Sequence, residues 1–190
     1  NSKIRSGTFG RGIWETSLFN NSDTTSPIAN CNNITVPLNT SGSVTINAID
    51  IDNGSTDNLG IVDYSINIDT FDCNDIGATS VILTVTDAAG NTDTCTAIVT
   101  VVDSTLPTLV CQDLTVQLNT AGLVTIMAAD IDNGSSDNCG IASYALDIDT
   151  FDCSNVGANT VTLTVTDDNG NSDTCTAIVT VVDSTLPTLV

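Results

Sequence analysis

The chain has 190 residues with 23 acidic and 3 basic side chains, a formal net charge of −20, and all three basic residues lie within its first eleven positions. Because phosphate groups are bound by Lys and Arg, this balance argues against nucleic acid and against an anionic membrane surface as partners. The mean hydropathy is nevertheless positive, +0.21, which predicts a folded chain. We recognise no run of 18 apolar residues and no leader sequence, so neither a membrane span nor a signal peptide is predicted.

The first 30 residues differ from the rest of the chain. Residues 13–19 fall where the last strand of a preceding domain would lie, and Gly10 stands at the position of Gly90. We therefore predict that residues 1–30 are a strand and a linker, the tail of a preceding module. The alternative is a donor strand that completes the sheet of a neighbouring subunit.

The remainder is a tandem repeat. A shift of 80 positions aligns residues 31–110 with residues 111–190 without a gap, and 56 of the 80 pairs are identical. We expect each copy to be one domain. A domain of this size buries a limited fraction of its surface, so disulfides or metal ions are expected to stabilise it.

Within a copy the apolar pattern is that of strands. In the second copy, strands are predicted at residues 114–118, 123–129, 141–146, 148–153, 161–166 and 174–182, separated by Gly- and Asn-containing turns. This spacing predicts an all-β fold, a seven-strand antiparallel sandwich of immunoglobulin type in each copy. Its core is expected to consist of Val, Ile, Leu and Ala with Tyr144.

A loop of Asp, Asn, Ser and Gly follows the second predicted strand, at residues 50–58 and again at 130–138. Oxygen-only side chains around a sharp turn are what calcium requires, so we predict a calcium site. The alternative is a solvated turn, since these are also ordinary turn residues. The spacing is not that of a helix-loop-helix calcium site, because Ile61 and Ile141 stand where that motif has its closing acid.

The strand directions bring three acidic segments to the end of each domain at which the linker arrives: the linker, the Asp-rich loop and the turn before the last strand. A cation there would tie consecutive domains together. The candidate calcium ligands are Asp23, Asp50, Asp52, Asp57 and Asp87 in the first copy and Asp103, Asp130, Asp132, Asp137 and Asp167 in the second.

The seven cysteines, without any His or Cys-x-x-Cys pair, predict disulfides and an extracellular location. Cys111 opens the first predicted strand and Cys175 the last, both near the linker, so these two can pair. The same holds for Cys31 and Cys95 in the first copy.

The second predicted pair is Cys139 with Cys153, which flank the third and fourth strands. The first copy has Leu59 at the position of Cys139, so Cys73 is left free or bonds to another chain. Four cysteines also permit other pairings, between which the sequence does not decide.

Three motifs of the second copy resemble the hyalin repeat (HYR) and its bacterial relatives: Asp-Asn-Cys-Gly at 137–140, and the runs at 161–171 and 174–183. The linker at 183–187 also resembles those of repeats in large bacterial surface adhesins. The resemblance covers residues 31–190 and implies an immunoglobulin-like extracellular module. In the adhesin relatives calcium lies at domain junctions, which would place it on the acidic residues of the second copy named above.

No set of residues predicts an enzyme, because the chain has no His and its paired carboxylates recur in both copies. We predict a structural module of an extracellular bacterial surface fibre or adhesin stalk, with neighbouring repeats or subunits as partners. The alternatives are a calcium-dependent carbohydrate-binding module, whose aromatic candidates are Tyr64, Phe71, Tyr144 and Phe151, and a filament subunit that polymerises by donor-strand exchange.

Overall fold

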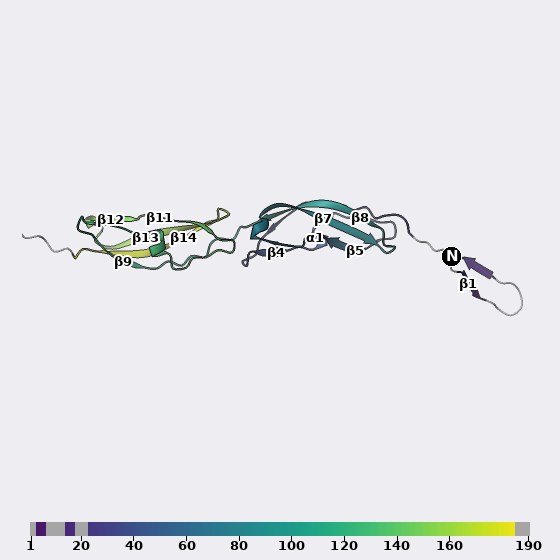
Figure 1. Cartoon of the computed structure of the whole chain (residues 1–190), viewed down its shortest axis with the longest axis horizontal. Coiled ribbons are helices and arrows are strands. Elements are labelled where there is room, and N and C mark those ends of the chain that lie inside the picture. The colour runs from purple at the N-terminus through teal and green to yellow at the C-terminus, as the bar shows by residue number, and fades with distance from the viewer. Residues whose placement is uncertain (1–2, 7–13, 18–22, 185–190) are drawn as a thin grey trace, which may run out of the picture. The chain divides into compact units, whose positions relative to one another are not determined.

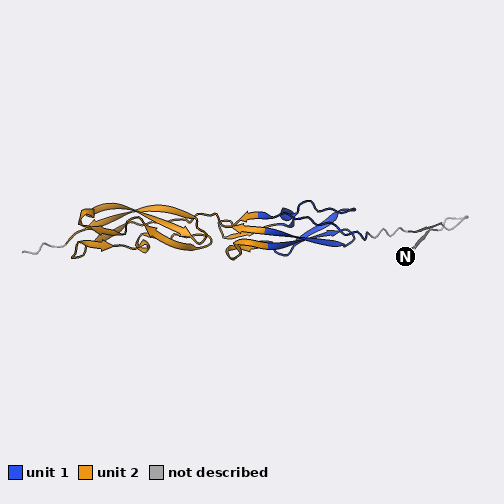
Figure 2. Cartoon of the chain, turned by 90° about the horizontal axis from the view of Figure 1, so that it is seen from above, with its two compact units in different colours: residues 1–34, 47–69, 80–98 blue, residues 35–46, 70–79, 99–190 orange. Residues whose placement is uncertain are grey.

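A computed structural model describes residues 3–6, 14–17 and 23–184 (Figure 1). Its contacts divide into two compact units, one of residues 1–34, 47–69 and 80–98, the other of residues 35–46, 70–79 and 99–190 (Figure 2). The second unit therefore contains the second repeat together with one end of the first repeat. In the described part of the chain, no helix is long and apolar enough to cross a membrane.

The second repeat consists of two sheets. A four-stranded sheet has the order β11-β13-β14-β9, and a two-stranded sheet pairs β10 with β12. A single helical turn, α2, follows β10, and a short 3-10 turn, η2, follows β12. The elements are β9 (Leu114–Gln117), β10 (Leu123–Thr125), α2 (Ala128–Ile131), β11 (Ile141–Leu146), β12 (Thr150–Asp152), η2 (Cys153–Asn155), β13 (Gly157–Asp167) and β14 (Ser172–Val182).

The first repeat has the same elements in the same order. Its sheets have the orders β3-β8-β7-β5 and β4-β6. Each element begins and ends 80 positions before its counterpart. The elements are β3 (Ile34–Pro37), β4 (Ser43–Thr45), α1 (Ala48–Ile51), β5 (Ile61–Ile66), β6 (Thr70–Asp72), η1 (Cys73–Asp75), β7 (Gly77–Asp87) and β8 (Thr92–Val102).

Strict alternation along the two longest strands makes the core. In β13, Val161, Leu163 and Val165 are fully buried while the Thr residues between them are not, because successive side chains of a strand point to opposite faces. Residues of β12, α2 and β14, and of the loops on either side of β10, complete this hydrophobic cluster. Its buried members are Leu118, Ile126, Ile131, Phe151, Val161, Leu163, Val165, Ala177, Val179 and Val181.

The buried aromatic residue of the second repeat is not the one predicted from the sequence. Tyr144 was expected in the core, but it is 41% exposed, whereas Phe151 is 1% exposed and packs in the core cluster. The two lie on different strands, and only β12 directs its middle residue inward. Phe71 is buried like Phe151, so neither phenyl ring offers a surface for a sugar.

The all-β, immunoglobulin-like fold is confirmed, with three local differences, the first being that each repeat has six described strands instead of the predicted seven. The edge strand β9 pairs with β14 in parallel, so the sandwich is not antiparallel throughout. The strand predicted at 123–129 ends at Thr125 and gives way to α2. The cause lies in Asp130, whose carboxylate accepts the Met127 N–H at 2.8 Å and closes the first turn of a helix.

We call the two ends of a repeat the linker pole and the distal pole. At the linker pole of the first repeat, β5 begins and β7 ends, because Ile61 pairs with Asp87. At the distal pole, β4 and β6 pair, and η1 begins at Cys73. The segment 108–111 of the incoming linker joins the second repeat through isolated antiparallel bridges to residues 132–136.

Two predicted disulfides are present and one is wrong. Cys31 bonds to Cys95, and Cys111 bonds to Cys175. The predicted Cys139–Cys153 bond does not form: Cys139 bonds to Cys73 of the first repeat instead, with 5.4 Å between the Cα atoms.

The reason is the strand that separates Cys139 from Cys153. Six residues of β11 span about 20 Å from pole to pole, whereas a disulfide needs Cα atoms within about 7 Å. Cys139 lies at the linker pole and meets the distal pole of the preceding repeat. Cys153 is exposed and unbonded among the described residues.

The N-terminal strands pair with each other. β1 (Lys3–Ser6) and β2 (Trp14–Ser17) form a two-stranded antiparallel sheet in which Lys3 is opposite Ser17. They lie 80 positions before parts of β7 and β8. The predicted strand at 13–19 thus pairs on its own chain over residues 14–17, and its other residues lie outside the described part.

Candidate metal centre

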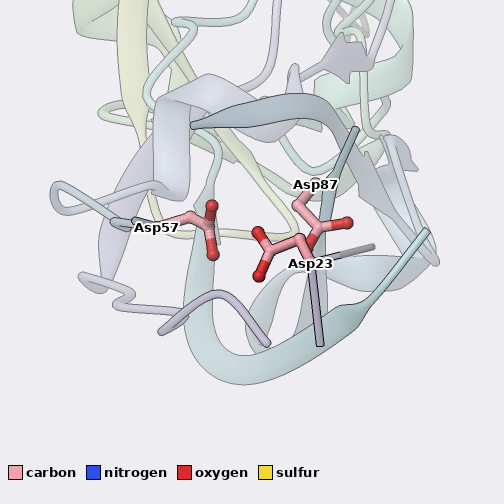
Figure 3. Close-up of side chains that lie close together, drawn as sticks. All are labelled: Asp23, Asp57 and Asp87. Atoms are coloured by element: carbon pink, nitrogen blue, oxygen red, sulfur yellow. The ribbon is translucent and has the colours of Figure 1, made fainter. Parts of the chain in front are cut away.

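Two groups of three aspartates lie at the two linker poles. In each group one carboxylate oxygen per residue lies within 4.8 Å of the other two. Figure 3 shows the first group, Asp23, Asp57 and Asp87, converging from three separate segments of the chain. The second group is Asp103, Asp137 and Asp167. We call them the first and the second Asp cluster.

Three different elements supply each cluster. Asp103 belongs to the linker, Asp137 to the loop between α2 and β11, and Asp167 is the last residue of β13. The first cluster has the same sources, 80 residues earlier. Asp87 and Asp167 are the deepest members, 2% and 1% exposed, while the other four are half-buried.

Hydrogen bonds within the last turn fix the buried member. Asp167 Oδ1 accepts the backbone N–H groups of Asn169 and Asn171, both at 2.8 Å. The Asn171 amide donates to Asp167 Oδ2 at 2.7 Å and to the backbone carbonyl of Asp103 at 3.3 Å. One Asn side chain thereby joins the turn to the linker.

The corresponding turn in the first repeat keeps its aspartate charged. Burial of Asp87 opposes ionisation, but hydrogen bonds from the Asn91 side chain and from the N–H groups of Asn91 and Ala89 outweigh it and lower the pKa of Asp87 below 3.8. At neutral pH this nearly inaccessible side chain is therefore an anion.

The second Asp cluster contains oxygens that no hydrogen bond reaches. Asp137 Oδ2 accepts the Cys139 N–H at 2.8 Å, and Asp103 Oδ1 accepts the Thr105 N–H at 3.0 Å. The other oxygen of each, together with the side-chain oxygen of Asn138, is buried without a partner among the described residues. Such oxygens are costly to bury unless a cation or a donor faces them.

The Asn138 amide cannot relieve this by turning over. Its nitrogen already donates to the Asn39 carbonyl at 3.2 Å and to Asp103 Oδ1 at 3.3 Å. In the first repeat the Asn58 amide nitrogen donates to Asp23 Oδ1 at 3.4 Å, and with the amide turned over it would donate to Asp57 and Asp23 at 3.0 and 3.3 Å. In both clusters an Asn side chain therefore lies against the carboxylates, and in the second its oxygen has no donor among the described residues.

This donor set fits a hard divalent cation. Two oxygens that both lie about 2.3 to 2.6 Å from one calcium ion are at most about 5 Å apart, which agrees with the 4.8 Å limit within each cluster. Three carboxylates and one amide supply at least four oxygens and neither nitrogen nor thiolate, so zinc and copper are not favoured. The three clustered residues of each repeat and the adjacent Asn, Asn58 or Asn138, would hold the ion.

Four of the ten predicted ligands lie elsewhere. Asp50 and Asp130 accept N–H groups of Asn47 and Met127 at the start of α1 and α2. Asp52 accepts the hydroxyl and the N–H of Ser55, and Asp132 accepts the Ser135 N–H. These four carboxylates shape the loop that carries Asp57 or Asp137, and they are not part of the described clusters.

The asparagines were missed by the sequence analysis. Asn58 and Asn138 follow the clustered Asp directly, and Asn91 and Asn171 close the last turn. The signal was present in the sequence, because Asn58 and Asn91 recur unchanged 80 positions later as Asn138 and Asn171. It was not distinctive, because Asn is common in turns throughout this chain.

Comparison with known proteins gives a match over most of the chain. The family model described as the HYR domain matches residues 22–101 and again residues 102–181. No curated protein matches.

Among solved structures, a four-domain crystal structure of protocadherin gamma B7 matches with a TM-score of 0.39 and 12% identity over 84% of this chain and 51% of that one. Drosophila N-cadherin EC1-4 matches with a TM-score of 0.43 and 13% identity over 83% of this chain and 50% of that one. Human mucin-like protocadherin EC1-2 matches with a TM-score of 0.38 and 15% identity over 83% of this chain and 98% of that one. The chain thus spans about half the length of the first two.

Proposed function

The chain belongs to the HYR domain family, and from this premise we propose that it is a structural module of an extracellular fibre or adhesin stalk. In this proposal calcium at each linker pole, together with disulfides, fixes each repeat to the segment that precedes it. A bacterial cell surface is the setting that the linker motif at residues 183–187 favours.

The observation that carries the proposal is the set of buried oxygens without donors in the second Asp cluster. Those of Asp103 and Asp137 belong to ionisable groups, and the chain has no basic residue beyond position 11 to offset them. A bound divalent ion would offset both and would give the Asn138 oxygen a partner. Calcium is favoured over magnesium because its longer and more variable bonds tolerate an irregular ligand set.

The position of the clusters supports a mechanical role. Each joins a linker residue, a loop residue and a strand end, so an ion bound there would restrict the linker to one path. The Cys73–Cys139 bond and the hydrogen bond from Asn138 to Asn39 join the second linker pole to the preceding distal pole. Three disulfides favour an oxidising, extracellular location.

The test is calcium titration of the metal-free chain by isothermal calorimetry, at constant ionic strength. We expect two equivalents to bind. Asp57→Asn and Asp137→Asn should each remove one equivalent or weaken it at least tenfold. The matched controls Asp50→Asn and Asp130→Asn change the same charge in the same loops and should leave both sites intact.

The mechanical part is tested separately by small-angle scattering of the chain with calcium and with a chelator. A shorter and broader distance distribution in chelator is expected. Binding of two equivalents without any change in scattering would leave the metal sites in place and refute their stiffening role. Absence of binding at millimolar calcium would refute both.

A further inference from the structure

Cys153 occupies a position whose counterpart in the first repeat forms a bond. It is exposed and unbonded, and it begins η2 as Cys73 begins η1, directly after the short strand β12 or β6. Cys73, 80 positions earlier, is bonded to Cys139 of the following repeat. Cys73 therefore shows, within the same chain, which bond a cysteine at this position forms.

Each of the two sulfurs has the same neighbour within its own repeat. Cys73 Sγ lies 3.6 Å from the Gly42 carbonyl oxygen, and Cys153 Sγ lies 3.8 Å from that of Gly122. Both glycines have a positive φ, +73° and +74°, and a Cβ on either would come within 2.8 or 2.7 Å of the neighbouring sulfur. The distal pole of the second repeat thus reproduces the site that receives Cys139 at the first.

The site at the first distal pole also contacts Asn138, the residue before Cys139. The carbonyl oxygen of Asn138 lies 2.7 Å from where a Cβ of Gly42 would be, an approach that only glycine permits. The Asn138 side chain donates to the Asn39 carbonyl at 3.2 Å. The second repeat has Asn119 and Gly122 at the equivalent positions, in a turn with the same Asn–Gly hydrogen bond of 2.9 Å.

We infer that the distal pole of the second repeat is a docking site for a further HYR repeat that carries Asp-Asn-Cys-Gly in its loop, and that Cys153 forms a disulfide with the cysteine of that loop. The linker pole of the first repeat cannot be this partner, because Leu59 stands at the cysteine position. Cys139 itself is already bonded.

The bond forms by oxidation of two thiols. Each sulfur loses its proton, the S–S bond forms, and the two electrons pass to a disulfide oxidant, which is reduced to two thiols. The presence of Cys or Leu in this loop then decides whether a junction is covalently locked. The junction before the second repeat is of the locked kind, and the loop of the first repeat is of the unlocked kind.

The test extends the chain by a third copy of residues 111–190 joined directly after Val190, which keeps the 80-residue register. In the present chain three disulfides leave one of seven cysteines as a thiol. The third copy adds four cysteines. If Cys153 bonds to the new loop and the third copy closes its own first-to-last strand bond, one thiol remains; if Cys153 does not bond, three remain.

Two controls separate docking from misfolding. Replacement of the third copy's loop cysteine by Leu, as at position 59, should leave two thiols, one of them Cys153. Cys153→Ser should also leave two, one of them in the third loop. Thiols are counted by iodoacetamide labelling and mass spectrometry, and the bond is identified after non-reducing digestion with a protease that cleaves at Asp.

A count of one, with Cys153 linked to the third loop, is the expected result, and it should be the same in chelator, because the bond does not depend on the proposed calcium. A count of three in a chain whose other disulfides are intact overturns the inference. Cys153 found bonded to Cys139, or to a second molecule, overturns it as well.

Discussion

Replacement of Asp137 by Asn should have opposite effects on stability with and without calcium. Without an ion, the carboxylates of Asp103, Asp137 and Asp167 lie within 4.8 Å of one another. Two unit charges about 4.8 Å apart repel by about 3.5 kcal/mol at an effective dielectric constant of about 20, and by about 0.9 kcal/mol in bulk water. Neutralising one of the three members removes two of the three repulsions, about 2 to 7 kcal/mol.

The lower part of this range applies, because Asp103 and Asp137 are half-buried and water screens them. A relief of about 2 kcal/mol corresponds to a rise of roughly 10 °C in Tm for a domain of this size. In calcium at about 100 times its Kd, the wild-type site gains about 2.7 kcal/mol. A variant whose site no longer binds the ion keeps only its relief of about 2 kcal/mol, so it should melt below the wild type by about 0.7 kcal/mol of stability.

The assay is differential scanning calorimetry in chelator and in calcium at low ionic strength. Asp130→Asn is the control, since it removes one charge from the same loop and an Asn oxygen can still accept the Met127 N–H. The control should show no reversal of sign. If Asp137→Asn melts below the wild type in both conditions, or shifts in the same way as Asp130→Asn, the three carboxylates are not a cation site.

Three further outcomes are expected. Burial of Asp52 opposes its ionisation, but hydrogen bonds from Ser55 outweigh the burial and lower the pKa of Asp52 below 3.8. The ionised carboxylate therefore stabilises the fold above pH 3.8. This contribution is lost as the pH falls through the lower pKa of the folded state. Ser55→Ala should therefore move acid unfolding, followed by circular dichroism, to higher pH; an unchanged midpoint contradicts this. Gly42→Ala should destabilise the chain by about 1 to 3 kcal/mol in urea and more than Gly122→Ala does, because only the Cβ at position 42 meets a backbone carbonyl; equal effects would show that the Asn138 loop does not dock there. Leu163→Ala should cost about 2 to 5 kcal/mol in the same urea assay, since Leu163 is fully buried, and a cost below about 1 kcal/mol would contradict the assignment of the core.

The first cysteine pairings were predictable because they depend on strand direction alone. Cys111 and Cys175 open two strands that begin at the same pole, and that follows from counting reversals of the chain. The partner of Cys139 was not predictable in this way, because it belongs to another repeat. Only the meeting of a linker pole with a distal pole brings Cys73 within reach.

The Asp-rich loop was likewise predictable from the sequence only in part. Composition indicated oxygen ligands and the strand count indicated convergence, so the two Asp clusters lie among the predicted residues. The sequence did not separate Asp137 from Asp130 and Asp132, which have the same chemistry a few positions away. The separation depends on which carboxylates are used by neighbouring N–H groups, as Asp130 is by Met127.

By itself, the sequence determined the repeat, the strand periodicity, the absence of compensating cations and the oxygen-only character of the loops, because these depend on residue type and on spacing along the chain. The tertiary structure decided which oxygens remain without donors, which Asn side chains point at them, and which sulfurs meet across a junction. Those features depend on contacts between residues up to 99 positions apart, such as Asn39 and Asn138. No local pattern encodes such contacts, because they exist only once two folded surfaces are placed against each other.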